Sequence, residues 1–304
     1  MSERTWTRRD FLGRAALGVG GLTAVGGTSL LTACQRTEPG TGQAAGSTLQ
    51  RIKDQGYVKV GYANEAPYAF EQDGQLKGED PAVSTAIFKA LGVDELRPEI
   101  AEFGSLIPGL AANRWDVVTA GMFILPERCS EADFSEPVYC ASSAFMVKKG
   151  NPKNLETYQD LAKTGAVMGA LTGAVEPDYA TGAGVNKSKI KSLASQQDGL
   201  EALLAGRIDA FALTSFSLNY LAETNKGAAI EVTTPFIPTI DGEKQIDCGG
   251  AVFRRGDDDL RKAYNRELAK LKQSGRLLEL IQPWGFGEET IPPKGLTTAE
   301  LCKA

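Results

Sequence analysis

The sequence contains no histidine at all. This absence excludes Ser-His-Asp and Cys-His catalysis, histidine general bases and histidine-ligated zinc. None of the five cysteines stands in a CxxC pair, so no cysteine metal motif is present either. The formal net charge of -5 gives no basic surface for nucleic acid. We therefore expect no metal, no cofactor and no nucleic-acid partner, and any enzyme would have to use carboxylates, lysine, tyrosine or cysteine.

Long apolar runs are also scarce, and the one candidate lies at the N-terminus. Residues 15–31 are about as long as a weak membrane span, but their glycines and threonines make a poor one. A twin-arginine pattern, Thr7–Leu12, precedes this run, and Leu31–Cys34 resembles a lipobox. We predict that residues 1–34 are a signal peptide and that Cys34 is lipidated, which places the protein on the outer face of the cytoplasmic membrane or in the periplasm. An uncleaved membrane anchor is the alternative.

Residues 35–47 are rich in Gln, Thr, Pro, Gly, Ala and Ser, which predicts a flexible tether. After the tether, segments with strand and helix patterns alternate, and this alternation favours an α/β fold with a mostly parallel, covered sheet. The length suggests about two domains. The predicted strands are Tyr57–Tyr62, Glu99–Phe103, Trp115–Ala120, Ala144–Val147, Ala166–Ala170, Ala210–Leu213 and Gly249–Phe253. The predicted helices are Leu49–Gln55, Pro81–Leu91, one from Ser105, Leu155–Ala162, Gln197–Leu204, Ser217–Thr224 and Asp258–Ile281, broken at Ser274–Gly275. We expect the ordered part to end at Trp284–Phe286.

Four cysteines remain once Cys34 is set aside. An even number in an exported protein indicates disulfides, and four cysteines allow three connectivities. Proximity along the chain favours Cys129 with Cys140 and Cys248 with Cys302, although the sequence leaves the pairing open.

Two segments offer groups that could hold an anion. Gly121–Arg128 follows a buried strand, and the guanidinium of Arg128 can bind a carboxylate through two parallel hydrogen bonds. The ordinary alternative is a surface arginine paired with Glu127 or Glu131. Leu171–Glu176 is a glycine turn that opens a helix, where free N-H groups and the helix dipole suit an anion. A purely structural turn is equally compatible with this pattern.

Several motifs together resemble one known family. They are Pro67–Phe70, Phe103–Leu110, Gly121–Arg128 with Asp133–Ser135, Gly206–Ala210, and Leu271–Gly275 through Trp284–Gly285. The chain resembles type II periplasmic binding proteins, the solute receptors of ABC importers, within the polar amino-acid branch. The resemblance implies two α/β lobes that are joined by two strand crossovers and close on the ligand, with lobe 1 at 48–143 and 251–304 and lobe 2 at 144–250 with the hinge strands. It also implies a non-catalytic, monomeric receptor whose partner is an ABC permease.

The same resemblance assigns roles at the ligand site. Arg128 matches the family's arginine for the ligand carboxylate, and Thr172 and Gly173 match its backbone anion donors. Two positions depart from the amino-acid pattern: Phe123 stands where Ser or Thr is usual, and Thr214 stands where an aspartate usually binds the ligand ammonium. Both usual ammonium partners are therefore expected to be absent.

Aromatic residues take their place in this prediction. Tyr68, Phe103 and Phe123 could surround a diffuse cation, and Glu65 could accept hydrogen bonds from ring N-H groups. This description resembles the ectoine- and hydroxyectoine-binding members of the family, so the expected ligand is a zwitterion with a delocalised positive charge. The alternatives are a polar amino-acid or betaine receptor, and a periplasmic dehydratase of cyclic carboxylates. Core packing is the alternative role for any single ring.

Overall fold

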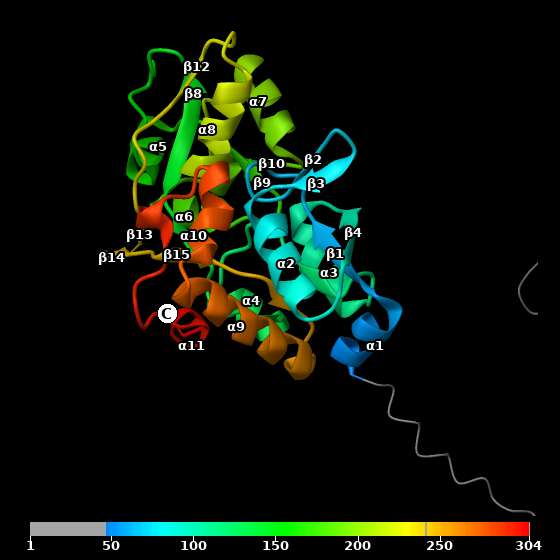
Figure 1. The fold of residues 1–304 in the computed structure, drawn as a ribbon. Coiled ribbons are helices and arrows are strands. Elements are labelled where there is room, and N and C mark those ends of the chain that lie inside the picture. The colour runs from blue at the N-terminus through cyan, green and yellow to red at the C-terminus, as the bar shows by residue number, and fades with distance from the viewer. Residues whose placement is uncertain (1–46, 241, 304) are drawn as a thin grey trace, which may run out of the picture. The chain divides into compact units, whose positions relative to one another are not determined.

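Two five-stranded sheets organise the part of the chain that the structure, a computed structural model, describes, which is residues 47–240 and 242–303. The first sheet has the order β4-β1-β5-β16-β6 and the second the order β10-β9-β11-β8-β12. In Figure 1 the second sheet lies with its helices around β8, and the first sheet lies with its helices around β1. The predicted signal peptide, Cys34 and most of the predicted tether lie outside the described residues.

The two sheets share one pairing pattern. In the first, β1 pairs in parallel with β4 and β5, while β16 pairs antiparallel with β5 and β6. In the second, β9 pairs in parallel with β10 and β11, while β8 pairs antiparallel with β11 and β12. The α/β class is confirmed, and each sheet is mixed rather than mostly parallel.

The strands of the first sheet are β1 (Tyr57–Tyr62), β4 (Glu95–Ile100), β5 (Val117–Val118), β6 (Asp133–Phe134) and β16 (Val252–Phe253). Those of the second are β8 (Ser143–Lys148), β9 (Met168–Leu171), β10 (Ile190–Leu193), β11 (Ala210–Thr214) and β12 (Ile230–Val232). Two hairpins stand apart, namely β2 (Phe70–Gln72) with β3 (Gln75–Lys77), and β13 (Thr239–Ile240) with β14 (Glu243–Lys244).

The helices of the first group are α1 (Thr48–Gln55), α2 (Glu79–Ala90), α3 (Leu106–Ala111), α4 (Pro126–Glu131), α9 (Asp258–Gln273), α10 (Arg276–Ile281) and α11 (Thr298–Leu301). Those of the second are α5 (Tyr158–Thr164), α6 (Glu176–Gly182), α7 (Gln196–Leu204) and α8 (Ser215–Thr224). Short 3₁₀ turns occupy Phe103–Ser105, Lys187–Lys189, Gln282–Trp284 and Glu288–Thr290. Among the described residues, no helix has the length and apolar character needed to cross a bilayer.

A two-stranded ribbon joins the two groups. Strand β7 (Tyr139–Ala141) pairs antiparallel with β15 (Asp247–Gly249), and the chain passes from β7 into β8 and from β15 into β16. The group around the first sheet, formed by the chain before β7 and from β16 onward, is called lobe 1 below, and the group around the second sheet, formed by the chain from β8 up to β15, is called lobe 2. The ribbon is the hinge between them.

Helix α2 shows how the lobe 1 core forms. Its side chains Val83, Ile87 and Phe88 are fully buried, and Phe88 packs edge-on against Tyr264 of α9 with ring centroids 5.8 Å apart. The Tyr264 hydroxyl lies 3.2 Å from the Ser84 hydroxyl, which gives both buried oxygens a hydrogen-bond partner. Burial of each large apolar side chain contributes roughly 1.5 to 3 kcal/mol.

Three local predictions differ from the structure. The strand expected at Glu99–Phe103 lies at Glu95–Ile100, and Phe103 instead begins a 3₁₀ turn. This edge strand is mostly exposed and polar, so its sequence lacks the apolar alternation of a half-buried strand. The expectation that order ends at Trp284–Phe286 is also wrong, because helix α11 follows. All six residues of Trp115–Ala120 are buried, although only Val117–Val118 form strand pairs.

The favoured disulfide pairing is wrong. The structure joins Cys129 to Cys302 and Cys140 to Cys248. Cys140 and Cys248 face each other in register across the hinge ribbon, and Cys302 follows α11, which lies against the segment that carries Cys129. Proximity along the chain misled the prediction because the hinge brings together residues 108 positions apart.

Candidate functional site

Glu65 lies in the loop that follows β1. This loop closes on itself, because Glu65 and Ala69 exchange backbone hydrogen bonds of 2.8 and 3.0 Å. The Glu65 side chain is 7% exposed, and the Ser217 hydroxyl of lobe 2 donates to its Oε1 over 2.6 Å. Burial raises the pKa of Glu65 to about 7, and the Ser217 hydrogen bond partly opposes this rise. The carboxyl group can therefore be neutral or ionised near neutral pH.

Arg128 lies on α4 (Pro126–Glu131), which begins at Pro126. Its Nη1 donates to the Phe123 carbonyl and its Nη2 to the Gly173 carbonyl of lobe 2, with a donor–acceptor distance of 3.0 Å in each bond. Burial lowers the pKa of Arg128, and nearby Glu176 opposes the shift. A guanidinium keeps its charge in proteins and has five N-H donors, so donors remain for a ligand carboxylate. The hydrogen bonds described for this side chain go to carbonyls and not to Glu127 or Glu131.

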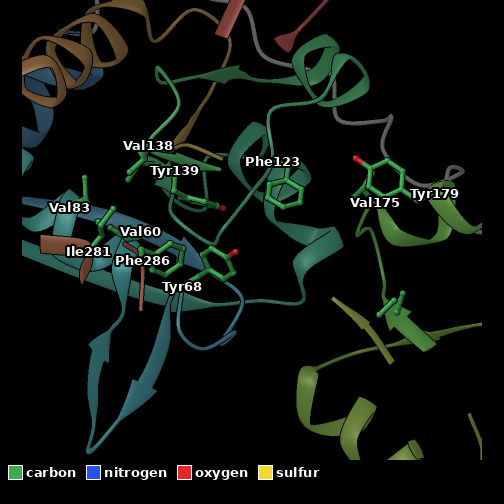
Figure 2. Close-up of a cluster of buried hydrophobic side chains, with 14 of the residues drawn as sticks. Val60, Tyr68, Val83, Phe123, Val138, Tyr139, Val175, Tyr179, Ile281 and Phe286 are labelled. Carbon is green, nitrogen blue, oxygen red and sulfur yellow. The ribbon is translucent and has the colours of Figure 1, made fainter. Parts of the chain in front are cut away.

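Two of the three predicted rings lie at this site. Phe103 begins the turn after β4, and its ring centroid is 5.3 Å from the Arg128 guanidinium carbon. Phe123 is 6% exposed and is held by an antiparallel bridge to Gly249 at the hinge. In Figure 2, Phe123 lies between Tyr139 on one side and Val175 and Tyr179 on the other.

Tyr68 lies one layer beneath the predicted site and does not line it. Its ring packs with those of Tyr139 and Phe286 at centroid distances of 5.1 and 5.3 Å (Figure 2). Gly121 separates it from the cavity: a Cβ at Gly121 would lie 2.6 Å from the Tyr68 ring, and its φ is +64°. Because Gly121 has no side chain, the buried Tyr68 ring packs directly beneath the backbone that forms the floor of the cavity. Tyr68 therefore does not line the cavity itself.

Lobe 2 contributes the glycine turn and two strand ends. The Thr172 N-H donates to the Leu193 carbonyl over 3.0 Å, so this predicted anion donor is engaged within lobe 2. Gly173 meets Arg128 through its carbonyl, a contact that the sequence did not suggest. The Thr214 hydroxyl caps α8 by accepting from the Ser217 N-H, so it too has a structural partner.

Glu176 is the principal site residue that the sequence analysis missed. It begins α6, is 4% exposed, and has no hydrogen-bond partner for its Oε2 among the described residues. Burial raises its pKa to about 8; its own backbone N-H opposes the rise, Glu65 and Asp247 add to it, and Arg128 lowers it. A glutamate in the first turn of a helix is normally a solvent-exposed partner of the helix dipole, so its position gave no signal of function.

The two lobes touch closely beside Arg128. A Cβ at Gly173, whose φ is +80°, would lie 2.6 Å from the Gly104 Cα of lobe 1. Together with the Ser217–Glu65 and Arg128–Gly173 hydrogen bonds, this contact shows that the cleft is closed. Gly173 is needed here because a side chain at this position would hold the two backbones apart.

The closed cleft contains about 320 Å³ of space free of atoms, its mouth included. Only about 20 Å³ of that space is accessible to the centre of a water-sized sphere, room for about one water molecule, so the side chains of the closed cleft nearly fill it. The predicted residues that line it are Glu65, Phe103, Phe123, Arg128 and Thr214, and the lining residues that were not predicted include Leu171, Ala174, Val175, Glu176 and Leu213. One guanidinium, two carboxyl groups and two phenylalanine rings thus surround a small cavity, a set that suits a small ligand with both an anionic and a cationic end.

Comparison with known proteins decides the family. Residues 58–288 match the family model of the bacterial extracellular solute-binding proteins, family 3. The chain belongs to this family. Such solute-binding proteins are the receptors of ABC importers, and an amino-acid-type ligand and a permease partner follow from membership.

Individual relatives of this solute-binding protein agree. A probable amino-acid ABC transporter periplasmic-binding protein of Sinorhizobium fredii is 35% identical over 268 residues, which cover 86% of this chain and 88% of the relative. An L-arginine-binding protein of Pseudomonas aeruginosa is 29% identical, with 73% of this chain and 85% of the relative covered.

Solved structures extend the comparison. The crystal structure of EhuB in complex with hydroxyectoine is 39% identical, has a TM-score of 0.77, and covers 84% of this chain and 97% of that chain. An ancestral amino acid-binding protein described as a precursor of cyclohexadienyl dehydratase is 28% identical with a TM-score of 0.68, over 78% of this chain and 99% of that chain. The two-lobe type II binding-protein fold is confirmed by these matches.

Proposed function

We propose that this solute receptor captures ectoine or hydroxyectoine and delivers it to the transmembrane subunits of an ABC importer. The observation that carries the proposal is the composition of the closed cavity. Arg128 offers free N-H donors to a carboxylate, while Phe103, Phe123 and Glu65 line the same space. The ring faces attract a delocalised cation with roughly 0.5 to 2 kcal/mol, depending on its desolvation, and Glu65 can accept hydrogen bonds from ring N-H groups.

The replacement of the family's usual ammonium-binding aspartate supports this choice over a standard α-amino acid. Thr214 stands where an aspartate is usual in the family, and its hydroxyl is engaged with Ser217. The similarity to EhuB, which was solved with hydroxyectoine, points in the same direction. In this proposal, residues 1–34 export the protein, Cys34 anchors it to the membrane by a lipid, and the imported solute serves osmoprotection.

A polar amino acid is the second candidate, because Glu176 adds a second carboxyl group to the cavity. Two carboxyl groups could accept from a guanidinium, and an L-arginine-binding protein is among the relatives. Betaines fit less well, since a quaternary ammonium has no N-H for Glu65 or Glu176. A dehydratase of cyclic carboxylates would need a proton donor and a proton acceptor close to the reacting carbon, roles that Glu65 and Glu176 could take, so conversion of prephenate has to be tested directly.

Calorimetric titration with a panel of solutes tests the proposal. Ectoine and hydroxyectoine should bind with micromolar or lower Kd, whereas glycine betaine, proline betaine, glutamine and arginine should bind at least tenfold more weakly. Equal affinity for arginine or glutamine would refute the ectoine assignment and leave the receptor function intact. Ectoine and prephenate should be recovered chemically unchanged after incubation, and any conversion would contradict a non-catalytic receptor.

A further inference from the structure

The helix that carries Arg128 has few contacts of its own. Helix α4 is six residues long, and its side chains are partly buried or exposed, none fully buried. Isolated helices this short are unstable in water, and a helix in a protein depends mainly on burying one face. The position of the guanidinium must therefore be set by connections from α4 to the rest of lobe 1.

The segment before α4 is held by the backbone. The Ile124 N-H donates to the Cys248 carbonyl over 2.9 Å, and Phe123 forms a bridge with Gly249. These bonds join the Phe123 end of the site to the hinge strand β15. They do not reach the turn that carries Arg128 itself.

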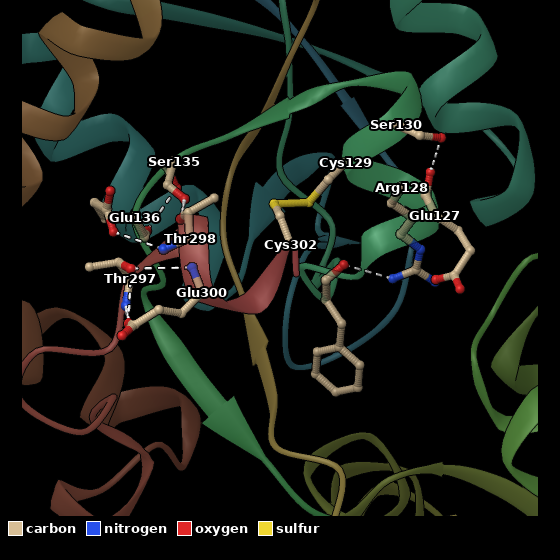
Figure 3. The surroundings of a disulfide bond; sticks show 11 residues. Glu127, Arg128, Cys129, Ser130, Ser135, Glu136, Thr297, Thr298, Glu300 and Cys302 are labelled. Atoms are coloured by element: carbon tan, nitrogen blue, oxygen red, sulfur yellow. Dashed lines mark hydrogen bonds between the residues drawn. A yellow bond between two sulfur atoms is a disulfide. The ribbon is translucent and has the colours of Figure 1, made fainter. Parts of the chain in front are cut away.

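The residue after Arg128 makes the covalent connection. Cys129 is bonded to Cys302 with a Cα–Cα distance of 5.7 Å, and Figure 3 shows this disulfide beside the Arg128 side chain. Cys302 follows helix α11, so the C-terminal segment is attached to α4 at the position next to the guanidinium.

Helix α11 is in turn fixed to lobe 1. The Thr298 hydroxyl donates to the Ser135 carbonyl over 2.6 Å, and the Thr298 N-H donates to the Glu136 carboxylate over 3.1 Å (Figure 3). Thr297 and Glu300 form a capping box at its start, and Leu301 is 6% exposed. The C-terminal helix is thus a firm support, and the disulfide transmits its position to α4.

We propose that Cys129 and Cys302 are positioning residues for the carboxylate subsite. Their disulfide holds α4 so that the Arg128 guanidinium keeps its bonds to the Phe123 and Gly173 carbonyls and presents its remaining donors to the ligand. The part that concerns ligand affinity rests on the proposed function, whereas the restraint on α4 does not.

Hydrogen exchange in the full, ligand-free chain tests the restraint. In the double variant Cys129→Ser/Cys302→Ser, the amides at positions 129 and 132, which donate to the Leu125 and Arg128 carbonyls, should exchange at least tenfold faster than in the unmodified protein. The amide of Leu91 at the end of α2 is the internal reference for a general loss of stability.

The double variant Cys140→Ser/Cys248→Ser is the matched control, because it also removes one long-range disulfide but not the one at α4. In this control, exchange at positions 129 and 132 should follow the Leu91 reference. The proposal is overturned if the α4 amides exchange no faster than the reference in the first variant, or equally fast in the control.

Binding supplies a second measurement that a merely structural role would not move. Loss of the Cys129–Cys302 disulfide should weaken ectoine binding about tenfold but leave binding of a cyclic amidine without a carboxylate unchanged. In an Arg128→Lys background, loss of the disulfide should cause no further weakening, because coupled residues are not additive. Additive losses, or equal losses for both ligands, would overturn the positioning role. If the unmodified protein binds none of the panel solutes, the proposed function fails, and the exchange experiment still decides the restraint.

Discussion

The two faces of the cleft have the same scaffold and different contents. Both lobes are built on five-stranded sheets with the same pairing pattern. Lobe 1 nevertheless presents a guanidinium, two phenylalanine rings and Glu65, while lobe 2 presents the Gly173 carbonyl, two hydroxyl groups and Glu176. In the proposed function, lobe 1 therefore holds most of the groups that select a ligand, and lobe 2 mainly completes and seals the site.

This division has a physical basis in how the faces meet. The Gly173 carbonyl and the Ser217 hydroxyl bond to Arg128 and Glu65, which are groups of lobe 1. Closure therefore orients the lobe 1 side chains and removes water around them, and electrostatic interactions strengthen in the drier site. The predictions below separate selection by lobe 1 from closure by lobe 2.

Replacement of Arg128 should have the largest effect. Arg128→Ala removes the carboxylate partner and leaves the Gly173 and Phe123 carbonyls without their donor. Breaking a buried charge pair costs about 3 to 5 kcal/mol, so we expect a loss of affinity of at least a hundredfold. Calorimetry measures it, and Arg128→Lys should retain part of the affinity. Unchanged ectoine affinity in Arg128→Ala would show that Arg128 does not bind the ligand carboxylate.

Closure by lobe 2 is tested by Gly173→Ala. The new Cβ would lie 2.6 Å from Gly104 and the φ of +80° is unfavourable for alanine, so the lobes should remain apart. We expect affinity to fall roughly tenfold or more, since only the closed fraction binds tightly, and small-angle scattering should show no compaction on addition of ligand.

Gly165→Ala is the matched control for Gly173→Ala. Gly165 also has a positive φ, +64°, but a Cβ there would meet no atom within 4 Å. Gly165→Ala should cost roughly 1 kcal/mol of stability and leave the affinity for ligand unchanged. Equal effects of the two substitutions on affinity would show that the Gly104–Gly173 contact has no role in closure.

Selection by the rings is tested by Phe123→Leu, which keeps an apolar side chain and removes the π face. A cation–π contribution of about 0.5 to 2 kcal/mol predicts a weakening of roughly 2- to 30-fold for ectoine. Phe123→Ala should weaken binding further because it also opens space in the floor. Equal binding by the unmodified protein and Phe123→Leu would indicate that the ring only fills volume.

The smallest expected effect is the pH dependence of binding through Glu65. Its pKa of about 7 means that the carboxyl group ionises as the pH rises through neutrality. A ligand cation pairs with the ionised form, so affinity should rise by up to about tenfold between pH 6 and pH 8. Glu65→Gln should flatten this part of the profile, and an unchanged profile in that variant would exclude Glu65 as its source.

The stability of the folded protein should change with pH in the opposite direction to its ligand affinity. Between pH 4.5, the ordinary pKa of a glutamate, and about pH 7, the folded protein keeps the Glu65 carboxyl group protonated, whereas the unfolded chain has already released the proton. The free energy of unfolding therefore falls as the pH rises through this window, by at most about 3 kcal/mol for this group. Glu65→Gln should reduce the fall, as followed by urea denaturation at pH 5 and pH 7.5. Part of the fall in the free energy of unfolding should remain in this variant, because the pKa values of Glu176 and Asp247 are also raised, to about 8 and about 7.

Much of the site segment in lobe 1 could be predicted because its signals are local. A buried apolar run, a glycine with positive φ and a proline at the start of a helix lie next to one another between Trp115 and Arg128, and each has its effect within a few residues. Glu176 had no comparable signal, since its burial arises from lobe 1 closing over the start of α6. Tyr68 was predicted as a wall of the site but lies beneath it, because its depth depends on Gly121, which lies 53 positions later.

By itself, the amino-acid sequence determined the α/β class, the order of most helices and strands, and the arginine with its neighbouring phenylalanine, because hydrophobic periodicity and glycine geometry act over short stretches of chain. Only the tertiary structure decided which cysteines pair, which two of the three rings reach the cavity, and that Thr172 is engaged while Glu176 is buried in the cleft. These features depend on distances between segments far apart in the sequence, and the hinge and the closed cleft set those distances.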